Sequence, residues 1–318
     1  MEIKDTFLER ETRLDFTIEP MMKRAWAASM EGLCEIERIC KKYEIQYFAD
    51  WGTLLGAVRH EGFTPWDDDI DITMKRPDYM KFLQVAPKEL RAPFEIISIY
   101  TDEAWDNMLS RVINGRSINV QPDYLKKFHG CPYVVGIDIF PLDYASRDEE
   151  ETQIQLDMVN IVLHAAAVER LYKNGECEKE ERDALVEQVE ELCNVKLDSS
   201  KSIEQQLRIL GDQLAMLYHE DEADELGIVL SRITNRPNYH FPKEYYAESI
   251  DKKFEDMVVP VPVGYDEILK LKYGEQYMIP NKEWLAHDYP FYKEQEKILA
   301  KELKRSGVSG EQFGIASE

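Results

Sequence analysis

Four aspartates lie in one short segment of the chain, and three of them are spaced by two. Asp67, Asp69 and Asp71 lie two positions apart in W-D-D-D-I-D-I-T-M. Residues two apart on a β-strand project from the same face, about 7 Å from each other, where two carboxylates repel by roughly 2 to 3 kcal/mol. A divalent cation turns this repulsion into attraction, and oxygen ligands suit Mg²⁺ or Mn²⁺. The spacing therefore predicts a metal site that includes Asp69 and Asp71. The alternative is a solvated acidic turn in which Asp67 or Asp68 accepts backbone N–H bonds.

A glycine and a threonine stand fifteen or so residues before these acids. Gly52 and Thr53 open an expected helix, where free backbone N–H groups and a hydroxyl can hold a phosphate oxygen. Arg59, two turns later, could add a bidentate positive charge, and His60 follows it as a further substrate-binding candidate. A helix-start phosphate site followed by an acidic strand indicates metal-assisted phosphoryl transfer. The alternatives are an ordinary N-cap for Thr53 and a surface ion pair for Arg59.

A third acid of the same kind occurs later in the chain, in G-I-D-I-F-P-L-D. Here Asp138 alternates with isoleucines near a strand end. If this strand lies beside the first one, Asp138 completes the metal site or takes the proton from an attacking hydroxyl. If it does not, Asp138 is a polar residue facing solvent. Asp143, which follows a proline, is expected to be a turn or cap residue.

Three further residues near the expected strands are positively charged or hydroxylic and are therefore secondary phosphate candidates: Lys75, Arg111 and Ser117. The six histidines show no metal-binding spacing, and no nucleophile-elbow, P-loop or dinucleotide-binding motif occurs.

The elements that must position these residues belong to an α+β fold. Apolar periodicity predicts helices over 18–43, 52–59, 77–90 and 265–273, and strands over 45–49, 69–74, 94–100, 107–114, 117–121, 134–140 and 257–259. Residues 147–220 are rich in glutamate and contain no proline, which is typical of helices. We therefore expect a catalytic core over 15–146, a helical subdomain over 147–241, a segment packing back on the core over 242–290, and a terminal helix with a loose tail over 291–318.

Composition narrows the classes of function. With 39 basic and 62 acidic side chains the formal charge is −23, which argues against nucleic-acid binding, although a local basic groove stays open. The start of the chain has no apolar signal region, and no apolar run approaches the roughly 20 residues of a membrane span. Five scattered cysteines indicate reduced thiols. The expected location is the cytoplasm, without a membrane span.

Three ordered blocks carry a resemblance to a known family. The stretch G-T-L-L-G-A-V-R-H-E-G-F-T-P-W-D-D-D-I-D-I, the block G-I-D-I-F-P-L-D, and residues 259–280 followed by His287 resemble the LicD family, named for bacterial phosphorylcholine transferases, and its relatives fukutin and fukutin-related protein. The resemblance implies a nucleotidyltransferase-like fold. In that pattern Gly52 and Thr53 occupy the phosphate-holding turn, Asp69 and Asp71 the metal-binding pair, and Asp138 the position of the third acid. Residues 147–241 are only loosely covered.

The resemblance also implies a reaction. Family members take a CDP-activated alcohol, such as CDP-choline, CDP-ribitol or CDP-glycerol, and pass the phospho-alcohol to a hydroxyl of a surface-glycan precursor: teichoic acid, capsule or lipopolysaccharide. CMP leaves. Aromatic faces would hold a choline head group, and Trp51 and Trp66 flank the proposed site in sequence. Polar side chains would suit ribitol or glycerol instead.

Three other functions stay open. One is a true nucleotidyltransferase that uses an NTP and releases pyrophosphate. Another is an inactive family member that binds glycans or serves as a scaffold. A third is a glycosyltransferase that uses the D-x-D spacing for a sugar nucleotide.

Overall fold

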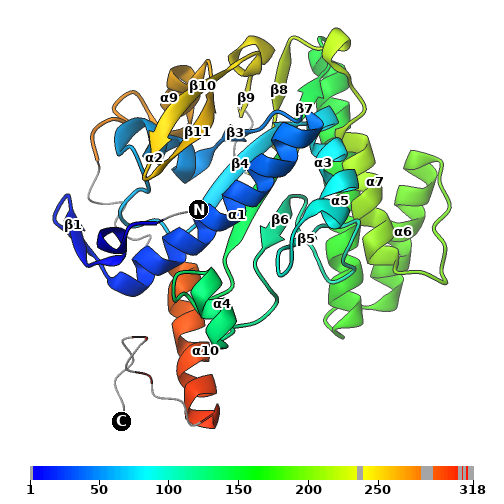
Figure 1. The fold of residues 1–318 in the computed structure, drawn as a ribbon. Helices are drawn as coiled ribbons and strands as arrows, with labels where there is room; N and C mark the ends of the chain where they lie inside the picture. Colours follow the sequence, from blue (N-terminus) through cyan, green and yellow to red (C-terminus); the bar gives the residue numbers. More distant parts are fainter. Residues whose placement is uncertain (1–2, 235–238, 281–288, 307–309, 311–312, 314–318) are drawn as a thin grey trace.

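A central mixed sheet organises the molecule. The computed structural model describes residues 3–234, 239–280 and 289–306, together with residues 310 and 313. The sheet order is β3-β4-β7-β6-β5, with β8 paired to the far end of β7 and β9 paired to β8 (Figure 1). The strands are β3 (Phe48–Ala49), β4 (Ile70–Lys75), β5 (Glu95–Ile97), β6 (Ser110–Ile113), β7 (Gly136–Ala145), β8 (Glu225–Gly227) and β9 (His240–Pro242). Among these described strands, only β4 and β7 pair in parallel. The predicted α+β class with a nucleotidyltransferase-like core is confirmed.

The apolar face of this sheet is covered by helices. On β4 and β7, Ile70, Ile72 and Ile137 are fully or almost fully buried. Helix α1 (Pro20–Tyr43) packs across them, so close to β7 that a Cβ on Gly32 would lie 2.4 Å from the Ile137 side chain. Helix α3 (Arg76–Glu89) lies beside α1. Because side chains alternate along a strand, Asp71 of β4 and Asp138 of β7 must project from the opposite face.

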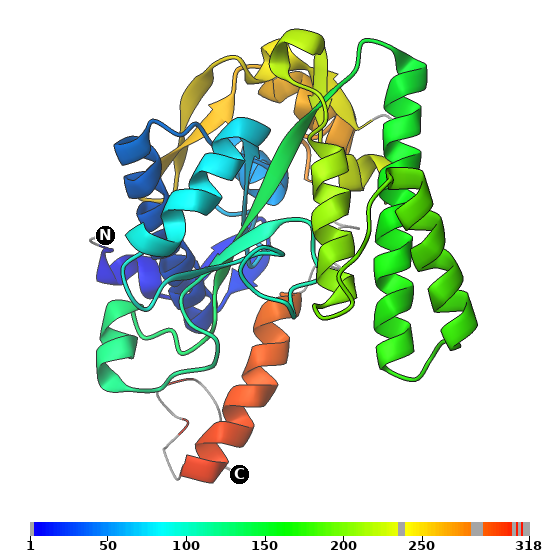
Figure 2. The same cartoon turned by 90° about the vertical axis from the view of Figure 1, so that its right-hand side faces the viewer.

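A column of helices stands beside the core. Helices α5 (Glu149–Lys173), α6 (Lys179–Cys193) and α7 (Ile203–Ala215) share a second cluster of buried apolar side chains, and Figure 2 shows them side by side in green. Within the 147–241 range, β8 extends the main sheet, and η2 (Glu220–Glu222) and α8 (Val229–Thr234) complete the segment. The division into domains at 146 and 241 stays a prediction.

Elements of the C-terminal part contact β3 and α2 (Trp51–Arg59). The elements here are η3 (Lys243–Tyr246), β10 (Ser249–Phe254), β11 (Met257–Pro262), α9 (Tyr265–Tyr273) and α10 (Pro290–Ser306). At the other end of the chain, η1 (Asp5–Leu8) and the hairpin of β1 (Glu11–Arg13) and β2 (Phe16–Ile18) precede α1. His287 lies outside the described residues.

One predicted strand was wrong, and another has different bounds. Residues 117–121 are not a strand, although Ile118 and Val120 alternate with polar residues; they form an irregular segment before α4 (Pro122–Lys127), which the periodicity did not predict. The cause is Pro122, whose fixed φ starts the helix, with the Asn119 side chain accepting the Gln121 N–H. The strand predicted over 134–140 begins at Gly136 and continues to Ala145, so that Asp143 lies within β7 and not in a turn.

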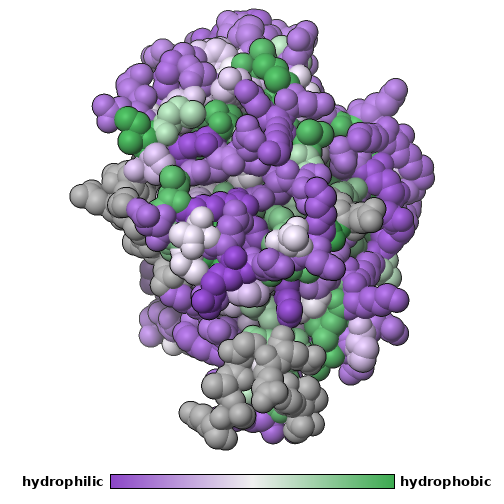
Figure 3. Space-filling model, turned by 60° about the vertical axis from the view of Figure 1, so that its left-hand side comes forward, coloured by the Kyte–Doolittle hydropathy of each residue, from purple (hydrophilic) through white to green (hydrophobic). Residues whose placement is uncertain are grey.

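The surface agrees with the strongly acidic composition. The face in Figure 3 is covered mainly by hydrophilic side chains, and apolar ones form small separate groups on it. Among the helices of the described residues, none combines the length and apolar character that a bilayer crossing requires.

Candidate active site

Parallel pairing of β4 and β7 brings the predicted acids together. Asp71 lies directly opposite Asp138 in the ladder, and Asp69 is one residue before β4. On the other side of β7, β6 places Arg111 opposite Asp138. The Arg111 guanidinium donates to both carboxylate oxygens of Asp138, with Nη2 2.7 Å from Oδ2. The structure therefore unites three acids and one predicted phosphate candidate across three neighbouring strands.

The start of α2 (Trp51–Arg59) is fastened to the same strand. The Thr53 hydroxyl accepts the Asp71 N–H at 2.8 Å, and the Asp50 N–H donates to the Asp71 carbonyl at 3.0 Å. A Cβ on Gly52 would lie 2.0 Å from a carboxylate oxygen of Asp67, so a side chain at this position would displace that carboxylate. The first turn of the helix therefore lies beside the acids, and free N–H groups at a helix start can hold a phosphate. The N-cap is Asp50, not Thr53.

A buried lysine supports this helix start. Lys272 of α9 forms an ion pair with Asp50, and both side chains are almost completely buried. Its Nζ lies 4.3 Å from the centre of the Trp51 ring, and that ring stacks on Tyr239. Trp51 also has a positive φ of 43°, which is uncommon for an aromatic residue. The segment 259–280 thus holds the helix start in place. Asp50 could have been recognised as an N-cap from its position before the helix, but nothing in the sequence identifies Lys272 as its partner.

Burial and mutual repulsion disfavour the charged forms of these acids. Burial raises the pKa of Asp67 to about 6, although a hydrogen bond with Asp69 opposes the shift. Burial, followed by the charges of neighbouring carboxylates including Asp138, raises the pKa of Asp69 and of Asp71 well above the usual range. An ion pair with Arg111 compensates one member of the group, Asp138. The cluster consequently favours an additional positive charge.

The oxygen atoms of the acidic segment fit a hard divalent cation. Asp67, Asp68 and Asp69 each offer an oxygen, and these three atoms lie within 4.8 Å of one another. Such carboxylate sets suit Mg²⁺ or Mn²⁺. The sequence favoured Asp69, Asp71 and Asp138 as ligands, whereas the closest convergence of oxygen atoms includes Asp67 and Asp68. The consecutive aspartates were the available signal. Asp68 is further fixed from α10, because its Oδ2 accepts the Tyr292 N–H at 3.0 Å.

A cavity of about 540 Å³ adjoins the acids on the side of β6 and α10. Asp68, Asp69 and Asp138 form its inner end, and Phe291 of α10 also lines it. Arg111 lies between the aromatic rings of Trp105 and Phe291, 5.5 and 5.6 Å from their centres. Sequence patterns did not single out Phe291, because α10 is far from the acids along the chain.

Two of the predicted substrate-binding residues lie at the other end of α2. The Arg59 Nη1 donates to the Tyr277 carbonyl at 2.8 Å, and its Nε donates to the His60 ring at 2.8 Å. Seven residues of helix separate Arg59 from Gly52, roughly 10 Å. Burial and then the Arg59 charge lower the pKa of His60 to about 4. The structure does not bring this pair to the first turn of α2.

Three substrate-binding candidates remain: Trp66, Lys75 and Ser117. Trp66 is buried and meets the rings of Phe16 and His60 edge-on. Lys75 ends β4, four residues and roughly 13 Å beyond Asp71. Ser117 is exposed on the segment that follows Arg116, a residue of the cavity wall.

A mixed sheet with acids on two parallel strands, facing the start of a helix, defines a nucleotidyltransferase-type domain. Residues 44–161 match the family model described as LicD/FKTN/FKRP, nucleotidyltransferase domain. A lipopolysaccharide cholinephosphotransferase LicD of Haemophilus influenzae is 28% identical over 253 residues, 77% of this chain and 87% of that protein. Two uncharacterized proteins, of Rickettsia typhi and Rickettsia prowazekii, are 43% and 41% identical over 54 residues, which is 17% of this chain and 18% and 20% of theirs. Over residues 44–161 the chain is therefore similar to the nucleotidyltransferase domain of the LicD family.

Proposed function

We propose that the chain transfers phosphocholine, or a related phospho-alcohol, from a CDP-activated donor to a hydroxyl of a cell-surface glycan precursor, releasing CMP. One observation carries the proposal: β4 and β7 bring Asp71 and Asp138 together beside the first turn of α2, where Gly52 lies next to the Asp67 carboxylate. The family match and the name of the Haemophilus influenzae relative support the reaction class. That name mentions lipopolysaccharide as well, so a lipopolysaccharide precursor is the first acceptor to test, before teichoic acid or capsule.

The site residues divide the work of phosphoryl transfer. The first turn of α2, with Gly52 and Thr53, would bind the donor diphosphate through backbone N–H groups. Asp69 and Asp71, with oxygens from the neighbouring aspartates, would hold Mg²⁺ or Mn²⁺, which supplies positive charge for the phosphate oxygens. Asp138 would take the proton of the acceptor hydroxyl. Arg111, already beside Asp138, would contact the transferred phosphate.

The bonds of the reaction balance without a further reactant. The acceptor oxygen forms a bond to the phosphorus that carries the alcohol, and its proton goes to the Asp138 carboxylate. The bond from that phosphorus to the bridging oxygen breaks, and CMP leaves with the electron pair. Catalysis then depends on position and charge, since the chain supplies no covalent nucleophile in this scheme.

The surroundings of Trp51 and Trp66 do not identify the donor alcohol, because neither tryptophan forms an open aromatic cage for choline. Trp51 is stacked on Tyr239 and lies next to the Lys272 ammonium, while Trp66 is buried. Choline remains the first donor to test, on the strength of the relative. We place the reaction in the cytoplasm, the location expected from the sequence, and cell fractionation tests this.

The test is CMP release from CDP-choline, CDP-ribitol and CDP-glycerol, each with Mg²⁺, with Mn²⁺ and with EDTA. We expect one CDP-alcohol to give metal-dependent CMP release and a phosphorylated acceptor. Pyrophosphate release from CTP or ATP without CMP release would instead support a true nucleotidyltransferase. Neither turnover nor thermal stabilisation with any of these compounds would support an inactive scaffold. In that case the proposal is wrong.

A further inference from the structure

The cavity beside the acids has no assigned occupant in this scheme. We propose that it binds a neutral sugar ring of the acceptor, with Phe291 as a binding residue and the reacting hydroxyl directed toward Asp138. The inference rests on the proposed function and adds to it the place and chemical class of the second substrate.

The position of the cavity relative to α2 supports an acceptor. Negative charge builds on the leaving phosphate as its bond breaks, so the N–H groups at the start of α2 are best used there. The sheet order places α2 on the β3–β4 side of the acids and the cavity on the β7–β6 side. In an in-line displacement the attacking and leaving oxygens lie on opposite sides of the phosphorus. The nucleophile therefore enters from the cavity, where Asp138 forms part of the wall.

The cavity wall suits a ring with both polar and apolar surface. Carboxylate and guanidinium groups at its inner end can accept from and donate to hydroxyls, while Phe291 presents an apolar face. Phe291 is 48% exposed, so part of its ring is available for contact. The C–H groups of a sugar ring are weakly positive and pack well on the electron-rich face of an aromatic ring. A volume of about 540 Å³ lies within the usual range for a small-ligand pocket.

Two anchors hold Phe291 in place. Tyr292, the next residue, donates its backbone N–H to Asp68 at 3.0 Å. Gln295, one turn later, donates to the Val134 carbonyl and accepts the Val134 N–H, both at 2.7 Å. The N-terminal turn of α10 is thus joined both to the acids and to the segment that leads into β7. A binding residue on this turn keeps a fixed position relative to Asp138.

The rival occupant is the donor's alcohol head group. A quaternary ammonium needs several aromatic faces. In this cavity the Arg111 guanidinium already lies over Trp105 and Phe291. A second guanidinium, that of Arg116, lines the same wall. Asp138 already pairs with Arg111, and the proposed divalent cation would neutralise the other carboxylates of the wall. With that cation bound, the guanidinium groups disfavour a cationic head group, whereas a neutral ring requires only the exposed part of Phe291.

The experiment measures how the full-length protein partitions the phosphocholine group between water and a sugar. CDP-choline and Mg²⁺ are incubated with methyl glycosides of glucose, galactose and N-acetylglucosamine as probes. The ratio of phosphocholine-glycoside to free phosphocholine is then measured in wild type, Phe291→Ala, Phe291→Trp and Ile298→Ala. Ile298 is also an exposed apolar residue of α10, at 53%, and serves as the matched control. Since both products arise from one bound donor, the ratio is independent of the folded fraction.

We expect Phe291→Ala to lower the ratio about tenfold, equivalent to about 1.4 kcal/mol. Phe291→Trp should restore the ratio, and Ile298→Ala should match wild type. An unchanged ratio in Phe291→Ala overturns the inference. If the KM for the donor rises at the same time, the cavity belongs to the donor. Hydrolysis of CDP-choline by wild type without transfer to any of the glycosides also overturns it. Failure to release CMP from any CDP-alcohol is a different result, which refutes the proposed function itself.

Discussion

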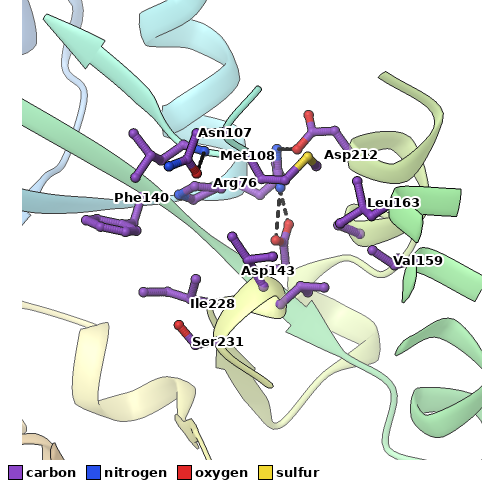
Figure 4. A pocket seen from close by; sticks show the side chains of 15 residues that line it. Arg76, Asn107, Met108, Phe140, Asp143, Val159, Leu163, Asp212, Ile228 and Ser231 are labelled. Atoms are coloured by element: carbon purple, nitrogen blue, oxygen red, sulfur yellow. Dashed lines mark hydrogen bonds and ion pairs between the residues drawn. The ribbon is translucent and has the colours of Figure 1, made fainter. Parts of the chain in front are cut away.

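Two acidic clusters in the molecule, one buried and one partly buried, differ in how their charge is balanced. At the junction of α3, β7 and α7, Arg76 lies between Asp143 and Asp212 (Figure 4). At the edge of the cavity, Asp67, Asp69, Asp71 and Asp138 share Arg111, which pairs with Asp138. Both clusters take carboxylates out of water, which is costly unless they are paired.

The first cluster is internally satisfied. Arg76 donates through Nε and Nη2 to Asp143, at 2.5 and 2.9 Å, and through Nη1 to Asp212 at 2.8 Å. The Tyr100 hydroxyl donates to the other oxygen of Asp212 at 2.5 Å. Burial alone would lower the pKa of Arg76, but the two carboxylates raise it. The adjoining cavity of about 50 Å³ has room for little more than water. This cluster joins the helical column to the sheet and has a structural role.

The second cluster has more acids than its guanidinium can compensate, and burial together with neighbouring carboxylates raises the pKa of Asp69 and of Asp71 well above the usual range. In the first cluster burial raises the pKa of Asp143 to about 6, but there Arg76 opposes the shift. Repulsion between carboxylates lowers stability, and groups with strongly shifted pKa values gather at functional sites. The charges of the first cluster are balanced within the chain, and we propose that a cation from solution completes the second.

The largest effect should come from the second cluster, because the contrast between the clusters is wrong if its acids are not needed for activity. We expect Asp71→Asn, and separately Asp69→Asn, to reduce kcat/KM for CMP release about a thousandfold or more. Loss of several kcal/mol of charge stabilisation corresponds to a factor of this size. Either substitution removes a repelling charge, so the free energy of unfolding should stay the same or rise. Wild-type kinetics in a folded variant would refute the metal assignment.

The first cluster should show the opposite behaviour. We expect Arg76→Met to lower the free energy of unfolding by about 3 to 5 kcal/mol, because it leaves two buried carboxylates without their cation. Urea denaturation measures this loss. Activity per folded molecule at low temperature should remain, since Arg76 does not line the larger cavity. A variant of normal stability with impaired turnover would reverse the roles that we assign to the clusters.

Cation binding distinguishes the clusters directly. At a hundredfold excess over its dissociation constant, Mg²⁺ should raise the free energy of unfolding by about 2.7 kcal/mol. This gain should be absent in Asp69→Asn and present in Arg76→Met, because only the former changes the proposed ligand set. Differential scanning calorimetry with Mg²⁺ and with EDTA measures both. An equal gain in all three proteins would place the cation elsewhere.

The comparison also shows what a sequence can reveal. Alternation over 69–74 and 136–140 predicted two strands whose acids share a face, and the parallel ladder sets Asp71 opposite Asp138. Asp143 was assigned to a turn because Pro141 precedes it. The strand continues past this proline, and Asp143 is buried in it. Its partner Asp212 comes from α7, and Lys272 reaches Asp50 from α9; periodicity reports which face is buried but not which distant charge lies against it. For the same reason Phe291 and Tyr292 were not anticipated.

We expect the smallest effect on stability from His60, which lies outside both clusters. Its contribution to stability falls as the pH falls, whereas that of carboxyl groups with raised pKa values rises. Its pKa of about 4 is below the usual 6.5 because burial and the Arg59 charge disfavour the imidazolium, and its Nε2 accepts from Arg59. Below about pH 6.5 His60 binds a proton in the unfolded chain, but in the folded chain it stays neutral until the pH approaches 4. The stability due to neutral His60 is therefore present above pH 6.5 and lost as the pH falls toward 4. Carboxyl groups with raised pKa values, such as Asp67, instead favour the folded state on acidification. Urea unfolding in EDTA at pH 7.5, 6.5, 5.5 and 4.5 should show wild type losing stability relative to His60→Gln as the pH falls. A constant difference between the two proteins would mean that His60 titrates normally in the folded state.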